Sequence, residues 1–340
     1  MKDFSLQTQA VSPAPGGATQ TVIMDYSNVV SKAELTTNRF DSPASLSFTC
    51  LESTGIGIPE GSSVELSVDG VKMFKGYVFT AERNRDGEVS YMARDQLRYL
   101  KAKASYTFEN MTLGQIIQQV ATDFGLTVGT LEDTGYVFPY LIMENESCLD
   151  FIFSKLSETI YRTGRIYNFY DNAGALTLTE AKNMYTSTLV GDGSLVTDYT
   201  YKRDIDSNTY NRVKLVRPNK ETGRADVYEH EDTETIKKWG LLQYYDQVDE
   251  NLNAAQIDEM CAAYLQYNNR VVQTLSIDDA LGVIGLRAGM AVPVSIGAVH
   301  DLSPMRLLLA EKVTHKFEGD VHTMSIEVKD FQQLGGVSIV

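Results

Sequence analysis

The 340-residue chain has little that would cross-link it or anchor it in a membrane. Its three cysteines, Cys50, Cys148 and Cys261, lie far apart and show no CxxC spacing. An odd, dispersed set of this kind excludes a disulfide framework and predicts buried, reduced thiols. No apolar run reaches the ~18 residues of a membrane-spanning helix, and residues 1–11 lack the basic-then-apolar pattern of a signal peptide. We therefore expect synthesis in the cytoplasm, without export by a signal peptide and without membrane insertion.

Basic residues are also scarce. Lys and Arg total 30 against 45 Asp and Glu, which gives a formal net charge of −15. A protein that grips nucleic acid gains affinity by neutralising phosphates, whereas this chain would repel them overall. The composition disfavours sequence-specific nucleic-acid binding. It is compatible with an acidic channel wall past which DNA moves without binding.

Catalytic motifs are missing as well. The sequence has no HExxH, no P-loop, no GxGxxG and no GxSxG. His315 and His322 are seven residues apart on predicted strands, so we expect them on opposite faces without a shared metal. The acidic run at residues 229–234 is typical of a solvated surface rather than of a glycosidase carboxyl pair. We expect no catalytic residue, no metal and no cofactor, and hence no enzyme.

The first 104 residues have the sequence pattern of β-strands and turns. Residues 64–68 alternate apolar with polar side chains, and Asp69-Gly70 follows as a hairpin turn. A return strand covers residues 73–81, and Asp86-Gly87 forms a second turn. Turns at this spacing predict an antiparallel barrel or sandwich.

Residues 105–188 have the texture of a small α/β domain. A helix is predicted after Thr112, which forms a capping box with Gln115, and it stops at Gly125. A second helix is predicted between Ser147 and Gly164. A hairpin follows it, so that the unit is inserted between two β-rich regions.

Strands return in residues 189–340, interrupted by a helical insertion at about residues 233–269. One helix of this insertion is predicted after Asn253, with Gln256 completing its cap. Tyrosine is abundant, with 19 residues, and its broad apolar body with a polar tip suits cores and interfaces. Trp239, Tyr244 and Tyr245 are candidate interface anchors.

A faint internal repeat links the two β-rich regions. Both copies read Gly-x-x-Val-x-Leu/Val-Ser-Val/Ile, followed in order by a turn, a strand, a second turn and a short strand that ends in Asp. The repeated positions are Gly61, Val64, Leu66 and Val68 in the first copy and Gly289, Val292, Val294 and Ile296 in the second. Pro293 inside the second copy predicts an edge position or a bulge there.

Four segments carry a resemblance to a known family: residues 91–101 (YMARDQLRYLK), 106–112, 123–126 and 239–245 (WGLLQYY). They resemble the XkdQ/YqbQ-type hub proteins of contractile phage tails and phage-tail-like bacteriocins. The resemblance is strongest over residues 88–130 and 208–250, and weakest over 1–40 and 331–340.

The resemblance implies an α+β, mainly β fold with two tube-like antiparallel β-barrels, at residues 1–104 and 189–340, and an inserted α/β domain at 105–188. It implies a structural baseplate hub that joins the sixfold tail tube to the trimeric spike through a pseudo-sixfold homotrimer. The implied partners are two further copies of the chain, the tube protein, the spike protein, and baseplate wedge or LysM-containing tail proteins. The protein would be made in the bacterial cytoplasm and assembled into the particle.

Two alternatives stay open. Residues 113–131 faintly resemble a LysM module, which would make the chain a peptidoglycan-binding part of a tail or cell-wall hydrolase complex. A cell-wall hydrolase is the other alternative, and the lack of a paired catalytic motif counts against it.

Overall fold

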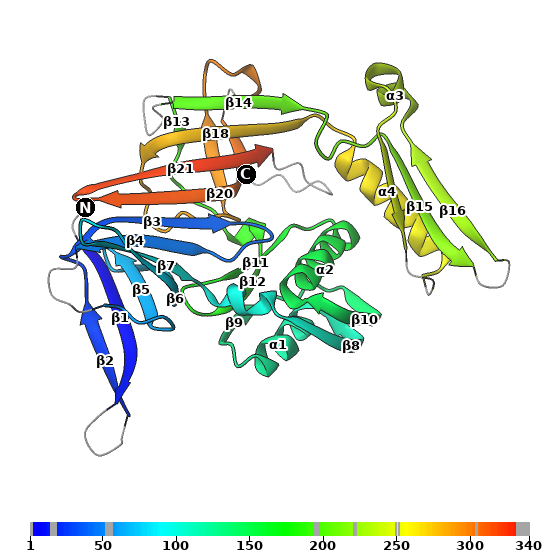
Figure 1. Cartoon of the computed structure of the whole chain (residues 1–340). Helices are drawn as coiled ribbons and strands as arrows, with labels where there is room; N and C mark the ends of the chain where they lie inside the picture. Colours follow the sequence, from blue (N-terminus) through cyan, green and yellow to red (C-terminus); the bar gives the residue numbers. More distant parts are fainter. Residues whose placement is uncertain are drawn as a thin grey trace.

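The computed structural model describes residues 3–13, 19–51, 57–192, 198–219, 223–248, 250, 252–302 and 305–330. These residues form four units: a first β region, an α/β unit, a second β region, and a lobe that leaves the second β region and returns to it (Figure 1). The α+β, mainly β class with antiparallel sheets is confirmed.

The first β region is an antiparallel run with the strand order β3-β4-β7-β6-β5-β1-β2. The alternation predicted at residues 64–68 is that of β5, and both Asp69 and Gly70 have positive φ angles, as the hairpin turn requires. Its strands are β1 (Phe4–Pro13), β2 (Thr19–Asp25), β3 (Val30–Asn38), β4 (Ser45–Leu51), β5 (Ser63–Val68), β6 (Val71–Arg83) and β7 (Glu88–Arg94).

The second β region has the order β14-β18-β21-β20-β19-β13 and is antiparallel except for the parallel β13–β19 pair. Its elements are β13 (Val190–Gly191), β14 (Asp198–Asp204), β18 (Val272–Leu281), β19 (Ala291–Ser295), the short helix η3 (His300–Leu302), β20 (Arg306–Glu318) and β21 (Val321–Asp330).

The two β regions share one sheet. β3 pairs with residues 312–318 of β20, which makes a single 13-stranded sheet out of both regions. Each region still packs its own hydrophobic core. No closed barrel occurs among the residues that the structure describes. The two regions are open, curved parts of one sheet (Figure 1), and the predicted barrels are not confirmed.

The α/β unit encloses the largest of the apolar cores that the described residues form. Both predicted helix caps are present: Thr112 with Gln115 at the start of α1, and Ser147 and Gly164 at the ends of α2. The elements are η1 (Gln96–Lys101), β8 (Lys103–Thr112), α1 (Leu113–Asp123), β9 (Val128–Leu131), β10 (Val137–Ser147), α2 (Cys148–Thr163), β11 (Tyr167–Asp171), β12 (Leu176–Glu180) and η2 (Ala181–Asn183).

The lobe is larger than the helical insertion predicted at about residues 233–269. It begins with β15 and contains its own three-stranded sheet, β16-β15-β17, packed on α4. Figure 1 shows it standing away from the main sheet. Its elements are β15 (Arg212–Asn219), β16 (Arg224–Glu231), α3 (Thr233–Trp239), β17 (Gln243–Gln247) and α4 (Ala254–Asn268), which starts with the predicted Asn253–Gln256 capping box.

Candidate functional site

The two glycines of the sequence repeat occupy matching places in the two β regions. The Gly61 N–H donates to the Val78 carbonyl at 2.8 Å, and the Gly289 N–H donates to the Ala310 carbonyl at 2.8 Å. Both glycines have positive φ angles, of 82° and 90°, a conformation that other residues rarely adopt. In both regions a β-bulge follows the accepting residue, at the β6–β7 and β20–β21 pairings.

The apolar positions of the repeat point into two separate cores. All six side chains are fully buried, and truncating the leucine or the isoleucine among them to Ala would cost about 2–5 kcal/mol. They are Val64, Leu66 and Val68 in the first core and Val292, Val294 and Ile296 in the second.

The strand order around these positions is also the same. Read outward, β3-β4-β7-β6-β5-β1 in the first region matches β14-β18-β21-β20-β19-β13 in the second. One difference is that β1 runs antiparallel to β5, whereas β13 runs parallel to β19.

Pro293 does not lie on an edge strand, because β19 pairs with β20 on one side and β13 on the other. The Ala291 N–H and carbonyl bond residues 184 and 186 on the β13 side. Backbone nitrogens two residues apart in a strand point to the same side, so the Pro293 nitrogen faces the β13 side, as the Ala291 nitrogen does. It lies between the Ala291 contacts and Val190, the first residue of β13. The missing N–H therefore removes no ladder hydrogen bond to β20.

A seam joins the two β regions along β3 and β20. The hydroxyls of Thr36 and Thr314 face each other across it at 3.1 Å. At one end of the seam the Arg39 guanidinium pairs with Glu311 at 3.1 Å, and both side chains are largely buried.

Asn168 of β11 connects this seam to the α/β unit and to the repeat. Its Oδ1 accepts from Arg39 Nε at 2.9 Å, and its Nδ2 donates to the Gly289 carbonyl at 2.9 Å. A Cβ atom at Gly289 would lie 2.8 Å from the Asn168 Cγ. The second glycine of the repeat is thus a contact point among three units of the chain.

A second buried polar cluster lies at the same junction. The Arg287 guanidinium sits 3.9 Å from the centre of the Tyr170 ring and donates to the Asp171 carbonyl at 2.9 Å. Burial, and next the nearby Asp171 carboxyl, raises the pKa of Asp95 well above its usual range. Burial also raises the pKa of Asp171, whose carboxyl accepts from Gln96 Nε2 at 2.8 Å. These groups hold elements together, and none of them faces the cleft described next.

A cleft of about 1220 Å³ lies between the α/β unit, the lobe and both β regions. Tyrosine rings line it: Tyr161 is 4.2 Å from Tyr264, and Tyr244 is 5.5 Å from Tyr264, centre to centre. The structure does not bring the three predicted anchors together. Tyr244 packs into this cluster, Tyr245 on the same strand is 59% exposed, and Trp239 is half-buried at the end of α3.

The prediction that His315 and His322 lie on opposite faces is wrong. The turn between β20 and β21 folds the chain back, so that His322 pairs with Phe317 across the hairpin, and the two imidazoles are 3.0 Å apart. Side chains alternate between the two faces of a sheet along one strand, but this rule does not relate two residues on different strands of a hairpin. Among the described residues no group of three or more His, Cys, Asp or Glu side chains is placed to hold a metal ion.

The three cysteines are buried and free, and burial raises the pKa of Cys50 and Cys261 to about 11. Within the described ranges, no helix combines the length and the apolar character that crossing a bilayer demands.

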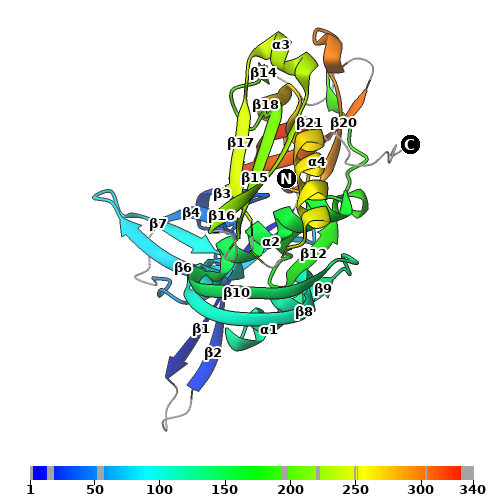
Figure 2. The same cartoon turned by 90° about the vertical axis from the view of Figure 1, so that its right-hand side faces the viewer.

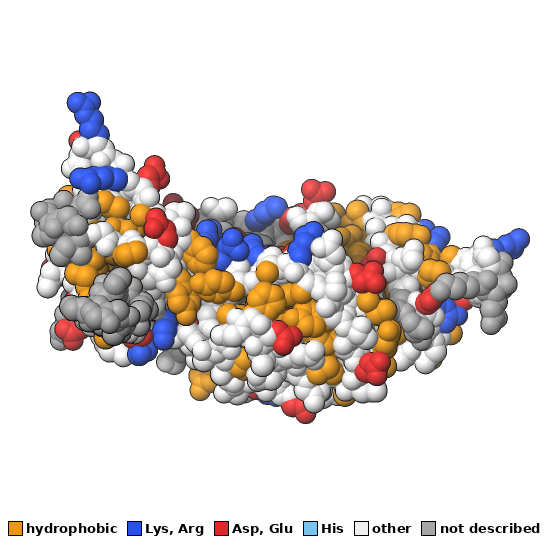
Figure 3. Space-filling model, turned by 60° about the horizontal axis from the view of Figure 1, so that its bottom comes forward, with side chains coloured by type: hydrophobic (Ala, Val, Ile, Leu, Met, Phe, Trp, Pro, Cys, Tyr) orange, Lys and Arg blue, Asp and Glu red, His pale blue; other side chains and the backbone are white. Residues whose placement is uncertain are grey.

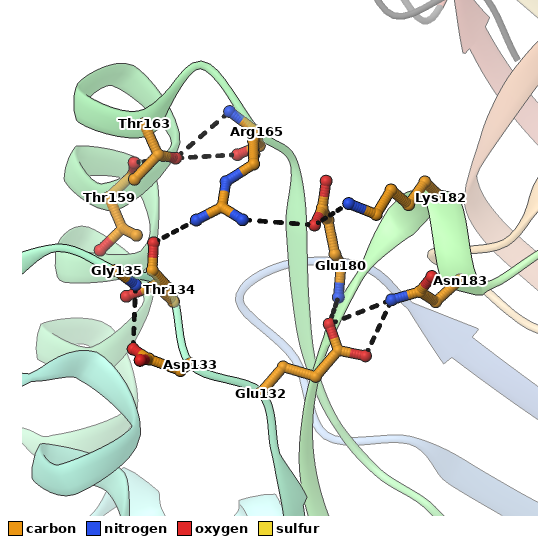
Figure 4. Close-up of polar contacts among 10 residues, drawn as sticks. All are labelled: Glu132, Asp133, Thr134, Gly135, Thr159, Thr163, Arg165, Glu180, Lys182 and Asn183. Carbon is orange, nitrogen blue, oxygen red and sulfur yellow. Dashed lines mark hydrogen bonds and ion pairs between the residues drawn. The ribbon is translucent and has the colours of Figure 1, made fainter.

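The segment that resembles a LysM module does not stand alone. α1 and β9 share one hydrophobic core with α2, β8, β10 and β12. Arg165, just after α2, bonds the Thr134 carbonyl and pairs with Glu180 at 3.6 Å (Figure 4). Glu180 also pairs with Lys182 at 2.8 Å, and its N–H donates to Glu132 at 2.8 Å. These acids bind neighbouring cations and backbone groups, an arrangement that supports the fold.

Apolar side chains also reach the surface. Figure 3 shows hydrophobic patches along the underside of the molecule. On β10, Val137, Tyr140 and Ile142 are between 43% and 54% exposed.

Comparisons with known proteins agree with the resemblance found in the sequence. The YqbQ-like family model matches residues 33–329. Over 307 residues the chain is 29% identical to the Bacillus subtilis (strain 168) protein YqbQ and 28% identical to the phage-like element PBSX protein XkdQ of the same strain. Both alignments cover 88% of this chain and 92% of the relative.

The 43 kDa tail protein of prophage MuSo2 from Shewanella oneidensis has a similar fold. Its crystal structure matches with a TM-score of 0.67 at 15% sequence identity, over 95% of this chain and 98% of that one. The fold is therefore shared across a large sequence distance. On the match of its family model over most of its length, the chain belongs to the YqbQ-like family.

Proposed function

We propose that this chain is a structural, non-enzymatic protein of a phage-type tail and that it forms the baseplate hub. Two similar proteins support a role in a phage-type tail. XkdQ is named a protein of the phage-like element PBSX, and the structurally similar MuSo2 protein is named a tail protein. The buried junctions described above hold strands and units together, as a protein that carries mechanical load requires.

The observation that carries the proposal is the matching strand order of the two β regions, together with their matching glycine hydrogen bonds. One chain contains two similar units in one sheet. Three chains arranged in a ring would present six similar units to a sixfold tube and three identical faces to a trimeric spike. The proposed partners are the tube protein, the spike protein, and wedge or LysM-containing tail proteins.

The surface features fit this role. The exposed apolar side chains on β10 and the tyrosine-rich cleft give the α/β unit and the lobe surfaces for neighbouring baseplate proteins. The net charge of −15 would let DNA pass a conduit wall without sticking.

The proposal is tested on particles purified from the bacterium that makes them, with an epitope tag at the C-terminus of the full chain. Electron microscopy with gold-labelled antibody should place the tag at one end of the tube, where the spike begins. Quantitative mass spectrometry should count three copies per particle. Label spread along the tube, a count of six, or absence of the chain from particles would overturn the proposal.

A further inference from the structure

β6 and β20 occupy matching places, yet the described strands pair with them to different extents. Each has 13 residues and contains the bulge described above. Before the bulge, each pairs with the short strand that precedes it, β5 or β19. After the bulge, β20 pairs with β3, whereas residues 80–82 of β6 pair, among the described strands, with β7 alone. The first β region thus has an open strand edge where the second has a filled one.

The strand that fills the edge of β20 also has a counterpart. β3 lies beside β4, and β4 lies beside β7; in the second region β14 lies beside β18, and β18 beside β21. β14 ends the sheet, and β18 is its one partner among the described strands. Among the described strands, β6 therefore has an open edge and β14 an open outer side, in the roles that β20 and β3 play in the seam.

The matching ladders fix a register for these two edges. Glu82 lies as far beyond the bulge of β6 as Thr314 lies beyond that of β20. Traced through the neighbouring strands, Lys202 of β14 takes the place of Thr36 of β3. Because Thr36 and Thr314 face each other in the seam, the same docking would set Lys202 opposite Glu82.

The side chains at these positions have opposite charges and lie at the surface. Glu82 is exposed, and the Lys202 side chain is 64% exposed, with its ammonium 2.8 Å from Asp204 on the same strand. Opposite charges directly across an antiparallel pair are favourable, whereas like charges there are unfavourable. The register derived from the fold therefore places two side chains of opposite charge, Glu82 and Lys202, across from each other.

We propose that the outer edge of β14 pairs antiparallel with residues 80–82 of β6 in a neighbouring copy of this chain, with Lys202 opposite the neighbour's Glu82. The proposal rests on the homotrimer of the proposed function. Each copy supplies one β14 and one β6 edge, so three copies satisfy all six edges in a closed ring. The β3–β20 seam inside each chain would alternate with an equivalent seam between chains.

A simpler explanation of the charges on β14 is protection. Edge strands often carry charged residues that discourage accidental pairing with other chains. Protection alone requires no partner at a defined register. It therefore does not account for the open edge of β6 at the equivalent position, or for the opposite charge that this position carries.

The test is a cysteine pair, Glu82→Cys with Lys202→Cys, in the full chain assembled into particles and oxidised before non-reducing electrophoresis. Within one chain, seven strand spacings separate β14 from β6, about 34 Å along the sheet. The two strands also lie apart in both views (Figures 1 and 2). A disulfide needs Cβ atoms about 4 Å apart, so this pair can close only between copies.

Two matched variants serve as controls. Thr36→Cys with Thr314→Cys places the same pair in the intrachain seam and should give a cross-linked monomer. Glu82→Cys with Asp198→Cys shifts the register by four residues on the same strand, about 13 Å. The expected result is covalent dimer and trimer without larger species, at about tenfold or more the yield of the shifted pair.

The outcomes separate the two proposals. Particles that contain the chain but yield no more cross-link from Glu82→Cys/Lys202→Cys than from the shifted pair would overturn the strand pairing and leave the hub intact. Covalent species larger than trimers would contradict the ring of three. Absence of the chain from particles would overturn the proposed function, and the strand pairing with it.

Discussion

His315 and His322 are joined across the β20–β21 hairpin, with His315 Nδ1 3.0 Å from His322 Nε2. His315 Nε2 lies 2.7 Å from the Leu286 carbonyl, which can only accept, so that nitrogen carries a proton. In the neutral pair, His315 Nδ1 is therefore the acceptor and His322 Nε2 the donor. The pair connects the hairpin to the loop before β19.

This pair predicts loss of stability in mild acid. Burial, and next the neighbouring His315, lowers the pKa of His322 to about 4, and burial lowers the pKa of His315. Because the folded state binds these protons less readily than the unfolded chain does, stability falls as the pH drops below about 6.5. For the partly exposed His322 we expect a loss of about 1 kcal/mol between pH 7 and pH 5.

The measurement is urea unfolding of the wild type and His322→Gln at both pH values. The variant keeps an N–H donor but cannot titrate, so its loss between pH 7 and pH 5 should be smaller. An unchanged loss would show that acid acts on other groups.

Gly61 and Gly289 form a matched pair that isolates the junction with the α/β unit. Both have positive φ, so an alanine at either place costs about 1–2 kcal/mol of backbone strain. At Gly61 the added Cβ meets open space, whereas at Gly289 it collides with Asn168. We expect Gly289→Ala to destabilise the chain by about 1–3 kcal/mol more than Gly61→Ala, because a buried hydrogen bond is also lost. Urea unfolding measures both, and equal losses would contradict a structural role for the Asn168 contact.

Local features of this fold could be predicted from the sequence. The capping boxes of α1 and α4 each involve residues three apart, such as Asn253 and Gln256, so their chemistry is visible in the chain order. The Asp69-Gly70 turn and the alternation of β5 are local for the same reason. The repeated glycine pattern identifies Gly61 and Gly289, which occupy equivalent positions in the two β regions.

The seam and the lobe could not be predicted, because they depend on distant pairing. Thr36 and Thr314 are in contact although 278 positions separate them, and neither strand has a sequence feature that indicates which strand it pairs with. β15 alternates like any half-buried strand, so the sequence does not show that it leaves the main sheet for a sheet of its own. The polar junction around Asn168 was missed as well. A buried asparagine after a helix leaves no signal in one sequence.

The cell-wall alternative predicts that the full chain is retained on purified peptidoglycan. We expect no retention above that of an unrelated acidic protein, because α1 and β9 are built into a common core with the rest of the α/β unit. A pull-down at low and high salt measures this directly. Saturable retention that survives high salt would favour the LysM-like function over the structural one.

Arg287 is the counter-charge of two buried carboxyls, and its removal should be among the most damaging single changes. Burial and the proximity of Asp171 raise the pKa of Asp95, while Arg287 opposes that rise. Arg287→Met would leave both carboxyls without this cation, at a cost of about 3–5 kcal/mol near neutral pH. Arg306→Met, at an exposed site on β20, serves as control and should cost less than about 0.5 kcal/mol.

The pH dependence gives the Arg287 prediction its second test. A carboxyl whose folded pKa lies above its unfolded value contributes most below the unfolded pKa, and that contribution is lost as the pH rises. Without Arg287 the pKa values of Asp95 and Asp171 rise further, so the stability gap between wild type and variant should be widest at pH 7 and narrow toward pH 4. Urea unfolding at three pH values measures this gap. A gap that stays constant would mean that Arg287 acts through packing on Tyr170 rather than through its charge.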